Sequence, residues 1–266
     1  MAKLDSVLGF TGSIGKLTAY KMKGSDEIIL RRKGGPSKEY IRNSPQFERT
    51  RWNNSEFGGR AAAAGWIMRG LHMHKALADY NIAGPLQALL RPIQLLDDKS
   101  RFGERHVQLS KNPRLLEGFS LNRKWVFDSV IRCPVNCRIT KDDLSAELNL
   151  PSLLPGINFF PTPKHPLFCI SVILALVPDV FYREGKYEPG KAYGRHYLNW
   201  QETRSQWLAT GSRSEEQSFR LKLEQSPPYE FFSLMVSAGI VYGMVTAPGS
   251  QEQAAYAGSA KVVAMM

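Results

Sequence analysis

The glycine-rich segment at residues 8–35 is the first candidate for chemistry, because closely spaced glycines can cradle a phosphate group. Its first three glycines recur at intervals of three residues: Gly9, Gly12 and Gly15. A phosphate-binding loop needs Gly-x-x-x-x-Gly-Lys followed by Ser or Thr, whose hydroxyl binds magnesium. Phe10 stands where the earlier glycine is required, and Leu17 follows Lys16 in place of the hydroxyl residue. The spacing therefore argues against nucleotide binding.

Histidines and cysteines are the next candidates, since they are the usual ligands of structural zinc. His72 and His74 flank Met73 but would diverge on a helix, and no carboxylate or cysteine adjoins them in the sequence. Cys133 and Cys137 are separated by three residues, one of which is proline. We expect no metal site, no cofactor and no enzymatic activity, although a catalytic site assembled from distant residues stays open.

Cationic side chains are concentrated in the first part of the chain. Residues 1–115 hold 20 Lys and Arg against 10 Asp and Glu, whereas residues 116–266 hold 15 against 14. Lys and Arg can neutralise phosphates, and the neighbouring Tyr20, Tyr40 and Trp52 could stack on unpaired bases. The candidate contacts to nucleic acid or to an acidic partner are Lys21, Lys23, Arg31, Arg32, Lys33, Arg42, Arg49 and Arg51. Interspersed Asp and Glu make a salt-bridged subunit contact an equally good interpretation.

Residues 16–22 and 27–33 have the length and composition of short β-strands. Lys23-Gly24-Ser25-Asp26 between them is typical of a turn, so the sequence predicts a β-hairpin. Charged residues inside both runs would leave the hairpin half exposed, and a two-stranded hairpin is barely stable alone. We therefore expect it to need a partner, either the rest of the chain or a neighbouring subunit.

Ser44-Pro45 predicts the start of a long helix, because Ser caps a helix and Pro suits its first turn. A stripe at helical spacing follows: Phe47, Thr50, Asn54, Phe57, Ala61, Ala64, Met68 and Leu71. We expect its aromatic residues to pack. Small residues should allow another helix to approach closely at Gly58, Ala61, Ala62 and Gly65. The candidate docking or oligomerisation residues are Gly9, Gly12, Gly15, Tyr20, Ile28, Leu30, Phe47 and Phe57.

A second helix is predicted from Gly84-Pro85 to Leu96, bent at Pro92. The polar run 97–112 then marks a boundary, after which helical spacing fades. Short β-like runs follow at residues 145–150, 167–177, 219–223, 231–245 and 260–264. We predict an α+β chain, with a basic hairpin-plus-helix region at 1–112 and a mainly antiparallel β-sandwich at 113–266. The sandwich would be immunoglobulin-like in style, although the Cys–Trp–Cys signature is missing.

Cysteine usage and hydrophobicity bear on location. Cys133, Cys137 and Cys169 are an odd number in a chain large enough to bury a core, which favours reduced thiols. The first residues lack the apolar stretch of a signal peptide, and the apolar run at 167–177 is too short to span a bilayer as a helix. We expect a cytoplasmic protein without a membrane span, and incorporation into a larger particle stays open.

The order GFTGSIGKLTAYKMKGSDEIILR, followed by KGG-P and a helix start with Arg, Asn and Phe, resembles an uncharacterised family of bacterial proteins, chiefly from Bacteroidota. Members of that family open with a Gly-Phe-x-Gly-x-x-Gly hairpin before a helix and a β-rich remainder. The similarity covers about the first 60 residues, and GFSLNR at 118–123 and GIVYG at 239–243 are similar in the same way. The family has no assigned activity, so the resemblance implies no catalytic residues and favours a phage-related or assembly-forming protein.

The sequence thus favours a non-enzymatic structural or assembly protein that forms a homo-oligomer or larger assembly. In this interpretation the N-terminal hairpin and helix mediate docking on another subunit or partner. The alternative is a nucleic-acid-binding protein that uses the same basic segment.

Overall fold

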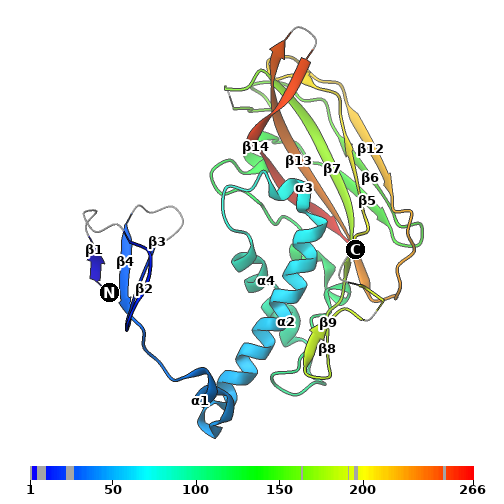
Figure 1. Cartoon of the computed structure of the whole chain (residues 1–266). Helices are drawn as coiled ribbons and strands as arrows, with labels where there is room; N and C mark the ends of the chain where they lie inside the picture. Colours follow the sequence, from blue (N-terminus) through cyan, green and yellow to red (C-terminus); the bar gives the residue numbers. More distant parts are fainter. Residues whose placement is uncertain are drawn as a thin grey trace. The chain divides into compact units, whose positions relative to one another are not determined.

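The computed structural model describes residues 2–4, 10–21, 27–162, 164–190, 192–194, 197–247 and 250–266 (Figure 1). These residues form a mixture of helices and strands, and the paired strands are antiparallel, as predicted. The chain divides into two compact units, residues 1–51 and residues 52–266. Within the described ranges, no helix is both long and apolar enough to cross a lipid bilayer.

The first unit contains a four-stranded antiparallel sheet in the order β1-β4-β3-β2. Its strands are β1 (Ala2–Leu4), β2 (Gly12–Ile14), β3 (Leu17–Lys21) and β4 (Ile28–Arg32). The predicted hairpin of β3 and β4 is confirmed, and its proposed turn at 23–26 lies outside the described residues. Gly15 and Lys16 make the turn between β2 and β3, and the φ of 55° at Gly15 suits a residue without a Cβ. Strands β1 and β2 were not predicted.

A short helix, α1 (Lys38–Asn43), follows the sheet and was also not predicted. The Ser37 hydroxyl caps it by accepting a hydrogen bond from the Tyr40 amide at 3.1 Å. The predicted helix start at Ser44-Pro45 begins as a 3₁₀ turn, Pro45–Phe47, which leads into α2 (Glu48–Gly70).

The helices of the second unit lie mainly before residue 131. They are the part of α2 after residue 51, α3 (His72–Lys75), α4 (Ala83–Leu95) and α5 (Phe127–Val130), with 3₁₀ turns at Leu109–Lys111 and Pro113–Leu116. Helix α4 is the second helix predicted from the sequence, and Pro92 lies inside it.

Three antiparallel sheets make up the rest of the second unit. In the largest, β10 (Trp200–Arg204), β7 (Leu167–Pro178), β13 (Phe232–Ala247) and β14 (Ser250–Met265) lie in that order, with β11 (Leu208–Ala209) also beside β7. The second has the order β12 (Gln217–Lys222), β6 (Ser145–Leu150), β5 (Asn136–Thr140). The third is the pair β8 (Phe181–Arg183) and β9 (Lys186–Glu188). Each run that the sequence predicts as a strand after residue 113 overlaps an observed strand, namely β6, β7, β12, β13 or β14.

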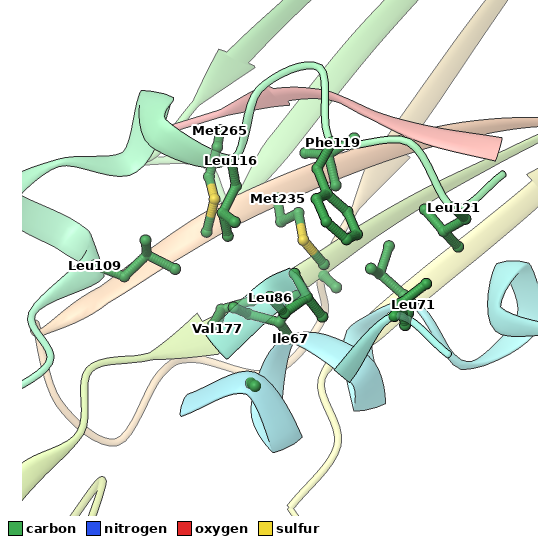
Figure 2. Packing of buried hydrophobic residues seen from close by; sticks show 14 of the residues in the cluster. Ile67, Leu71, Leu86, Leu109, Leu116, Phe119, Leu121, Val177, Met235 and Met265 are labelled. Atoms are coloured by element: carbon green, nitrogen blue, oxygen red, sulfur yellow. The ribbon is translucent and has the colours of Figure 1, made fainter. Parts of the chain in front are cut away.

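Strand β7 is buried on both faces, which explains why its sequence is apolar without alternation. Cys169, Ile173 and Ala175 join a hydrophobic cluster with helices α2 and α4, which Figure 2 shows from close by. The intervening Ile170 and Val172 join a second cluster with β6 and β12. The predicted boundary near residue 112 falls inside the second unit, where helices before it and strands after it share the first cluster.

The buried face of α2 differs from the predicted stripe. Its buried residues are Glu56, Gly59, Ala63, Ala64, Ile67 and Gly70. Phe57, expected to pack, is 53% exposed. Gly58 and Gly65, expected at a close helix approach, face open space, whereas a Cβ at Gly59 would lie 2.5 Å from the ring of Tyr187. Ala64 and Leu71 of the predicted stripe are buried, so the stripe is right at those positions. It was wrong at Phe57, because the helix packs closely there through the small residue Gly59.

Candidate functional site

The N-terminal sheet of the first unit has one apolar face. Residues that pair across an antiparallel sheet point to the same side, and alternate residues point to opposite sides. Ile14 pairs with Leu17, Ala19 with Leu30, and Lys21 with Ile28. The apolar face is therefore made by Ile14, Leu17, Ala19, Ile28 and Leu30. Two of the predicted docking residues, Ile28 and Leu30, are brought together on it.

This apolar face is only partly buried. Ile14 is 63% exposed and Leu17 is 42% exposed, whereas Ala19 and Ile28 are the buried apolar side chains among the described residues of the first unit. Both hydrophobic clusters of the described residues lie in the second unit. A small sheet needs a packed apolar face for independent stability, so this one has a surface that favours a partner.

The opposite face of the same sheet is polar. Ser13 and Thr18 lie side by side there, with their hydroxyl oxygens 3.1 Å apart. The Arg31 guanidinium lies over the ring of Tyr20, 5.8 Å from its centroid. Tyr20, predicted to dock, therefore lies on the polar face and away from Ile28 and Leu30.

Cations surround the apolar face. Lys21 and Arg32 belong to it by their pairing with Ile28 and Leu17. Lys16 and Lys33 adjoin Arg32 at one end of the sheet, where the Lys33 amide donates to the Lys16 carbonyl at 2.5 Å. Within the described ranges, no ion pair is found for the side chains of Arg31, Arg32 and Lys33.

The other predicted contacts are scattered. Arg42 and Arg49 are exposed, while the Arg51 guanidinium donates to the carbonyls of Ile41 and Ser44 at 2.9 and 2.8 Å and is thereby occupied. Among the predicted docking residues, Gly12 and Gly15 shape β2 and its turn. Phe47 packs edge-on against Tyr40, and Phe57 is exposed on α2 beside Arg60. Gly9 and Lys23 lie outside the described residues.

A second exposed element, at the end of β13 and β14, was not singled out in the sequence. Pairing of β13 with β7 ends at Gly243, but β13 stays paired with β14 as far as Ala247 and Ser250. Residues 243–247 and 250–253 therefore form a two-stranded extension, here called the ribbon (Figure 1). Val245 on it is 57% exposed, and the neighbouring Met244 is also exposed.

One histidine of the His72-Met73-His74 segment belongs to a buried polar cluster. His74 is fully enclosed, with Nδ1 2.8 Å from the Ser237 hydroxyl and Nε2 2.9 Å from the Ser171 hydroxyl. Burial, followed by the charge of Arg204, lowers the pKa of His74 to about 3. The Ser171 hydroxyl in turn donates to Glu202 Oε1 at 2.7 Å, and the Ser237 hydroxyl donates to the Lys261 carbonyl at 2.9 Å. Since Ser171 and Ser237 are themselves buried, this cluster has no access for a substrate.

In the part of the chain that the structure describes, no group of three or more His, Cys, Asp and Glu is placed to hold a metal ion. No protein-family model, no curated protein and no solved structure matches this chain. The arrangement of the site itself therefore carries the functional argument.

Proposed function

We propose that this chain is a non-enzymatic assembly protein whose copies join head to tail. The N-terminal sheet of one copy would dock on the ribbon of the next. The observation that carries this proposal is the partly exposed apolar face of the N-terminal sheet, in a unit whose described residues contain no hydrophobic cluster. Apolar surface of this kind is stabilised when it is removed from water by a partner.

Charge and shape favour the ribbon as the acceptor. The apolar face carries the cations Lys21 and Arg32. On the ribbon, exposed Met244 pairs with Glu252, so apolar and acidic groups lie side by side. A paired ribbon without a third strand is also marginally stable alone and gains from docking.

A symmetric contact between two N-terminal sheets is less favourable. It would bring Lys21 and Arg32 of both copies together, and like charges at an interface oppose association. A contact between two different surfaces avoids this repulsion. Such contacts repeat from copy to copy and close into rings or continue as filaments.

We further infer that the five-stranded and three-stranded sheets form a β-sandwich, immunoglobulin-like in style, that holds the ribbon. The second hydrophobic cluster supports this, because it joins side chains of β7 and β13 with those of β6 and β12.

Light scattering on the full chain tests the assembly. We expect a mass well above the 29.9 kDa of one chain at micromolar concentration. Leu17→Glu should reduce it to a monomer, because it places a charge on the apolar face. Thr18→Glu, the matched control on the polar face of the same strand, should still assemble. Circular dichroism confirms that both variants are folded.

A mixing experiment tests the head-to-tail arrangement. The double variant Met244→Asp, Val245→Asp should also be monomeric, and Gln225→Asp with Ser226→Asp, at exposed positions away from the ribbon, is its control. The double variant keeps an intact N-terminal sheet, and Leu17→Glu keeps an intact ribbon. In a mixture of the two, the sheet of the first variant can dock on the ribbon of the second. We expect one-to-one dimers and nothing larger. A wild-type monomer, or a mixture that stays monomeric, would overturn the proposal.

The basic end of the N-terminal sheet supports nucleic-acid binding as a second candidate function. Lys16, Arg31, Arg32 and Lys33 are adjacent there and exposed. If these four contact phosphates of a single strand, affinity should fall roughly fifty-fold between about 50 and 200 mM salt, because bound counterions are released. Fluorescence anisotropy with a labelled single-stranded oligonucleotide measures this. Arg31→Glu with Arg32→Glu should abolish binding, and the matched reversal Lys99→Glu with Arg101→Glu, at exposed positions of the second unit, should not. No binding by the wild type at about 0.15 M salt would end the idea.

A further inference from the structure

A cavity of about 420 Å³ lies in the second unit, between the segment after α3, the loop 122–125 and strands β13 and β14, and it is also lined by Thr162, Lys164 and His165. The accessible surface of its wall is mainly apolar, and half of the residues that line it have polar or charged side chains. This volume and this composition are typical of sites for small organic molecules. The proposed assembly uses neither the cavity nor the residues around it.

The walls of the cavity are held in place by hydrogen bonds within the protein. The Asn122 amide nitrogen donates to the Leu77 carbonyl at 2.7 Å, and its carbonyl oxygen accepts from the Ala260 amide at 3.0 Å. The Asp79 carboxylate accepts from the backbone amides of Arg123 and Lys124 at 2.8–3.0 Å. The loop and the strand edge are therefore fixed before any ligand arrives, which lowers the entropic cost of binding.

A buried hydroxyl on this wall has no partner. Ser259 is 1% exposed, and its Oγ makes no hydrogen bond to any residue that the structure describes. A buried polar group without a partner costs free energy, and such groups are rare in folded proteins. Ser259 borders the cavity, but its Oγ is covered by protein atoms, so ligand recognition at this site rests on the rings and charges that reach the cavity.

Flat surfaces line the same space. The rings of His165 and Tyr242 are stacked with their centroids 5.5 Å apart and their planes 22° from parallel. The Thr162 amide donates to the Tyr242 hydroxyl at 3.2 Å and helps to fix this ring. Trp125 also lines the cavity and is 54% exposed, although Trp is usually well buried. These rings favour a flat aromatic ligand.

The charge of the cavity is positive. Lys124 and Lys164 line it, are exposed, and form no ion pair with any described residue. The carboxylate of Asp79 is already bound by backbone amides. Two ammonium groups against one carboxylate leave a net charge of +1 beside an apolar space, which favours a ligand that carries a negative charge.

We propose that this cavity binds a small aromatic anion, such as an aromatic carboxylate. The ring of the ligand packs against Trp125 and the stacked pair of His165 and Tyr242. Its charged group lies near Lys124 and Lys164.

Calorimetric titration of the full chain with 2-naphthoate tests the proposal. We expect saturable binding of one molecule per chain. The uncharged analogue 2-naphthalenemethanol has the same ring system without the charge, and it should bind about tenfold more weakly, which corresponds to one charge-assisted contact. No saturable binding of 2-naphthoate, or equal binding of both compounds, would overturn the assignment.

Variants localise the site. Trp125→Ala should weaken 2-naphthoate at least tenfold, since aromatic anchors dominate such sites. Lys124→Gln with Lys164→Gln should weaken 2-naphthoate by a similar factor and leave 2-naphthalenemethanol unchanged. The matched control, Lys99→Gln with Lys186→Gln, removes two exposed charges elsewhere and should bind normally. Unchanged unfolding midpoints in urea show that each variant is folded, and normal binding by both cavity variants would refute the site.

Discussion

Arg105 binds Glu56 through two parallel hydrogen bonds, from Nε to Oε1 at 2.6 Å and from Nη2 to Oε2 at 2.7 Å. The Gly103 amide donates a third bond to Oε1 at 3.0 Å. Burial alone would raise the pKa of Glu56, but these bonds and the charges of Arg105 and Arg60 outweigh it and lower the pKa. The pair attaches the segment after α4 to the buried face of α2, and it explains how a glutamate can lie on that face.

Removing the charge of Glu56 should be strongly destabilising. Glu56→Gln leaves Arg105, whose side chain is largely covered, without its counter-ion, and we expect a loss of about 3 kcal/mol in the free energy of unfolding. Urea unfolding at pH 7 measures this, with Glu216→Gln at an exposed position as the control. Because the pKa of Glu56 is lowered by folding, its stabilisation is present above its unfolded pKa near 4.5 and is lost as the pH falls below it. A loss below about 0.5 kcal/mol would show that the pair contributes little.

Acid should destabilise the protein well before the carboxylates titrate. The pKa of His74 is 6.5 in the unfolded chain and about 3 in the folded chain. Between these two pH values the unfolded chain therefore binds a proton at His74 and the folded chain does not. Stability should therefore fall as the pH drops from 6.5 towards 3, by about 1.4 kcal/mol per unit once well below 6.5.

Urea unfolding at pH 7, 6 and 5 distinguishes this effect from that of Glu56. His74→Gln should remove the slope between pH 6.5 and 5, while His72→Gln, which alters the neighbouring exposed histidine, should keep it. A wild type with a flat profile over that window would contradict a neutral, buried His74.

Two neighbouring glycines of α2 should respond oppositely to alanine. A Cβ at Gly59 would lie 2.5–2.9 Å from three atoms of the Tyr187 ring, so Gly59→Ala should destabilise by about 1–3 kcal/mol. Gly58 faces open space, so Gly58→Ala should stabilise by about 0.5–1 kcal/mol through helix propensity. Thermal unfolding of the two variants side by side checks this. Equal effects would mean that α2 does not pack on Tyr187.

The three free cysteines should differ in reactivity. Burial raises the pKa of Cys137 and of Cys169 to about 11, and it raises the pKa of Cys133 less. Because the thiolate is the reactive form, Cys133 should react first with iodoacetamide at pH 8, and buried Cys169 should react only after unfolding. Peptide mass spectrometry of timed samples identifies each product. Early labelling of Cys169 would show that β7 opens readily.

Much of the secondary structure could be predicted from the sequence, because hydrophobic periodicity is a local property. Strand β6 alternates cleanly, and helix α4 carries leucines at helical spacing, so both were recognised. Strands β1 and β2 were missed because each is only three residues long. Such short strands form only because the neighbouring strands supply their hydrogen bonds.

The orientation of α2 shows where local patterns fail. Phe57 looks like a core residue and Glu56 like a surface residue, yet Glu56 is buried and Phe57 is exposed. The partner that makes this possible, Arg105, lies 49 residues further along the chain. Periodicity cannot detect a compensation between such distant residues.

The cavity could not be predicted from the sequence, because the residues that line it are also far apart along the chain. Its walls come from segments between Leu77 and Ser259 that only the fold brings together. The apolar face of the N-terminal sheet could be predicted in part, because Ile28 and Leu30 are two residues apart in one strand and so point to the same side. Which face Tyr20 lies on depends on the register of β3 against β4, which pairs it with Ile29 and not with Ile28 or Leu30.

His74 of α3 forms hydrogen bonds with Ser171 of β7 and Ser237 of β13, and these bonds affect the register in which the two strands pair. Both strands are apolar on both faces, so hydrophobic packing alone would tolerate a slip of one residue. In a slipped alignment Val236 or Ala238 would replace Ser237, and a nitrogen of His74 would face hydrocarbon without a partner. The hydrogen bonds of His74 therefore favour the observed register of β7 and β13 over registers shifted by one residue, in a part of the sheet where hydrophobic packing does not distinguish them.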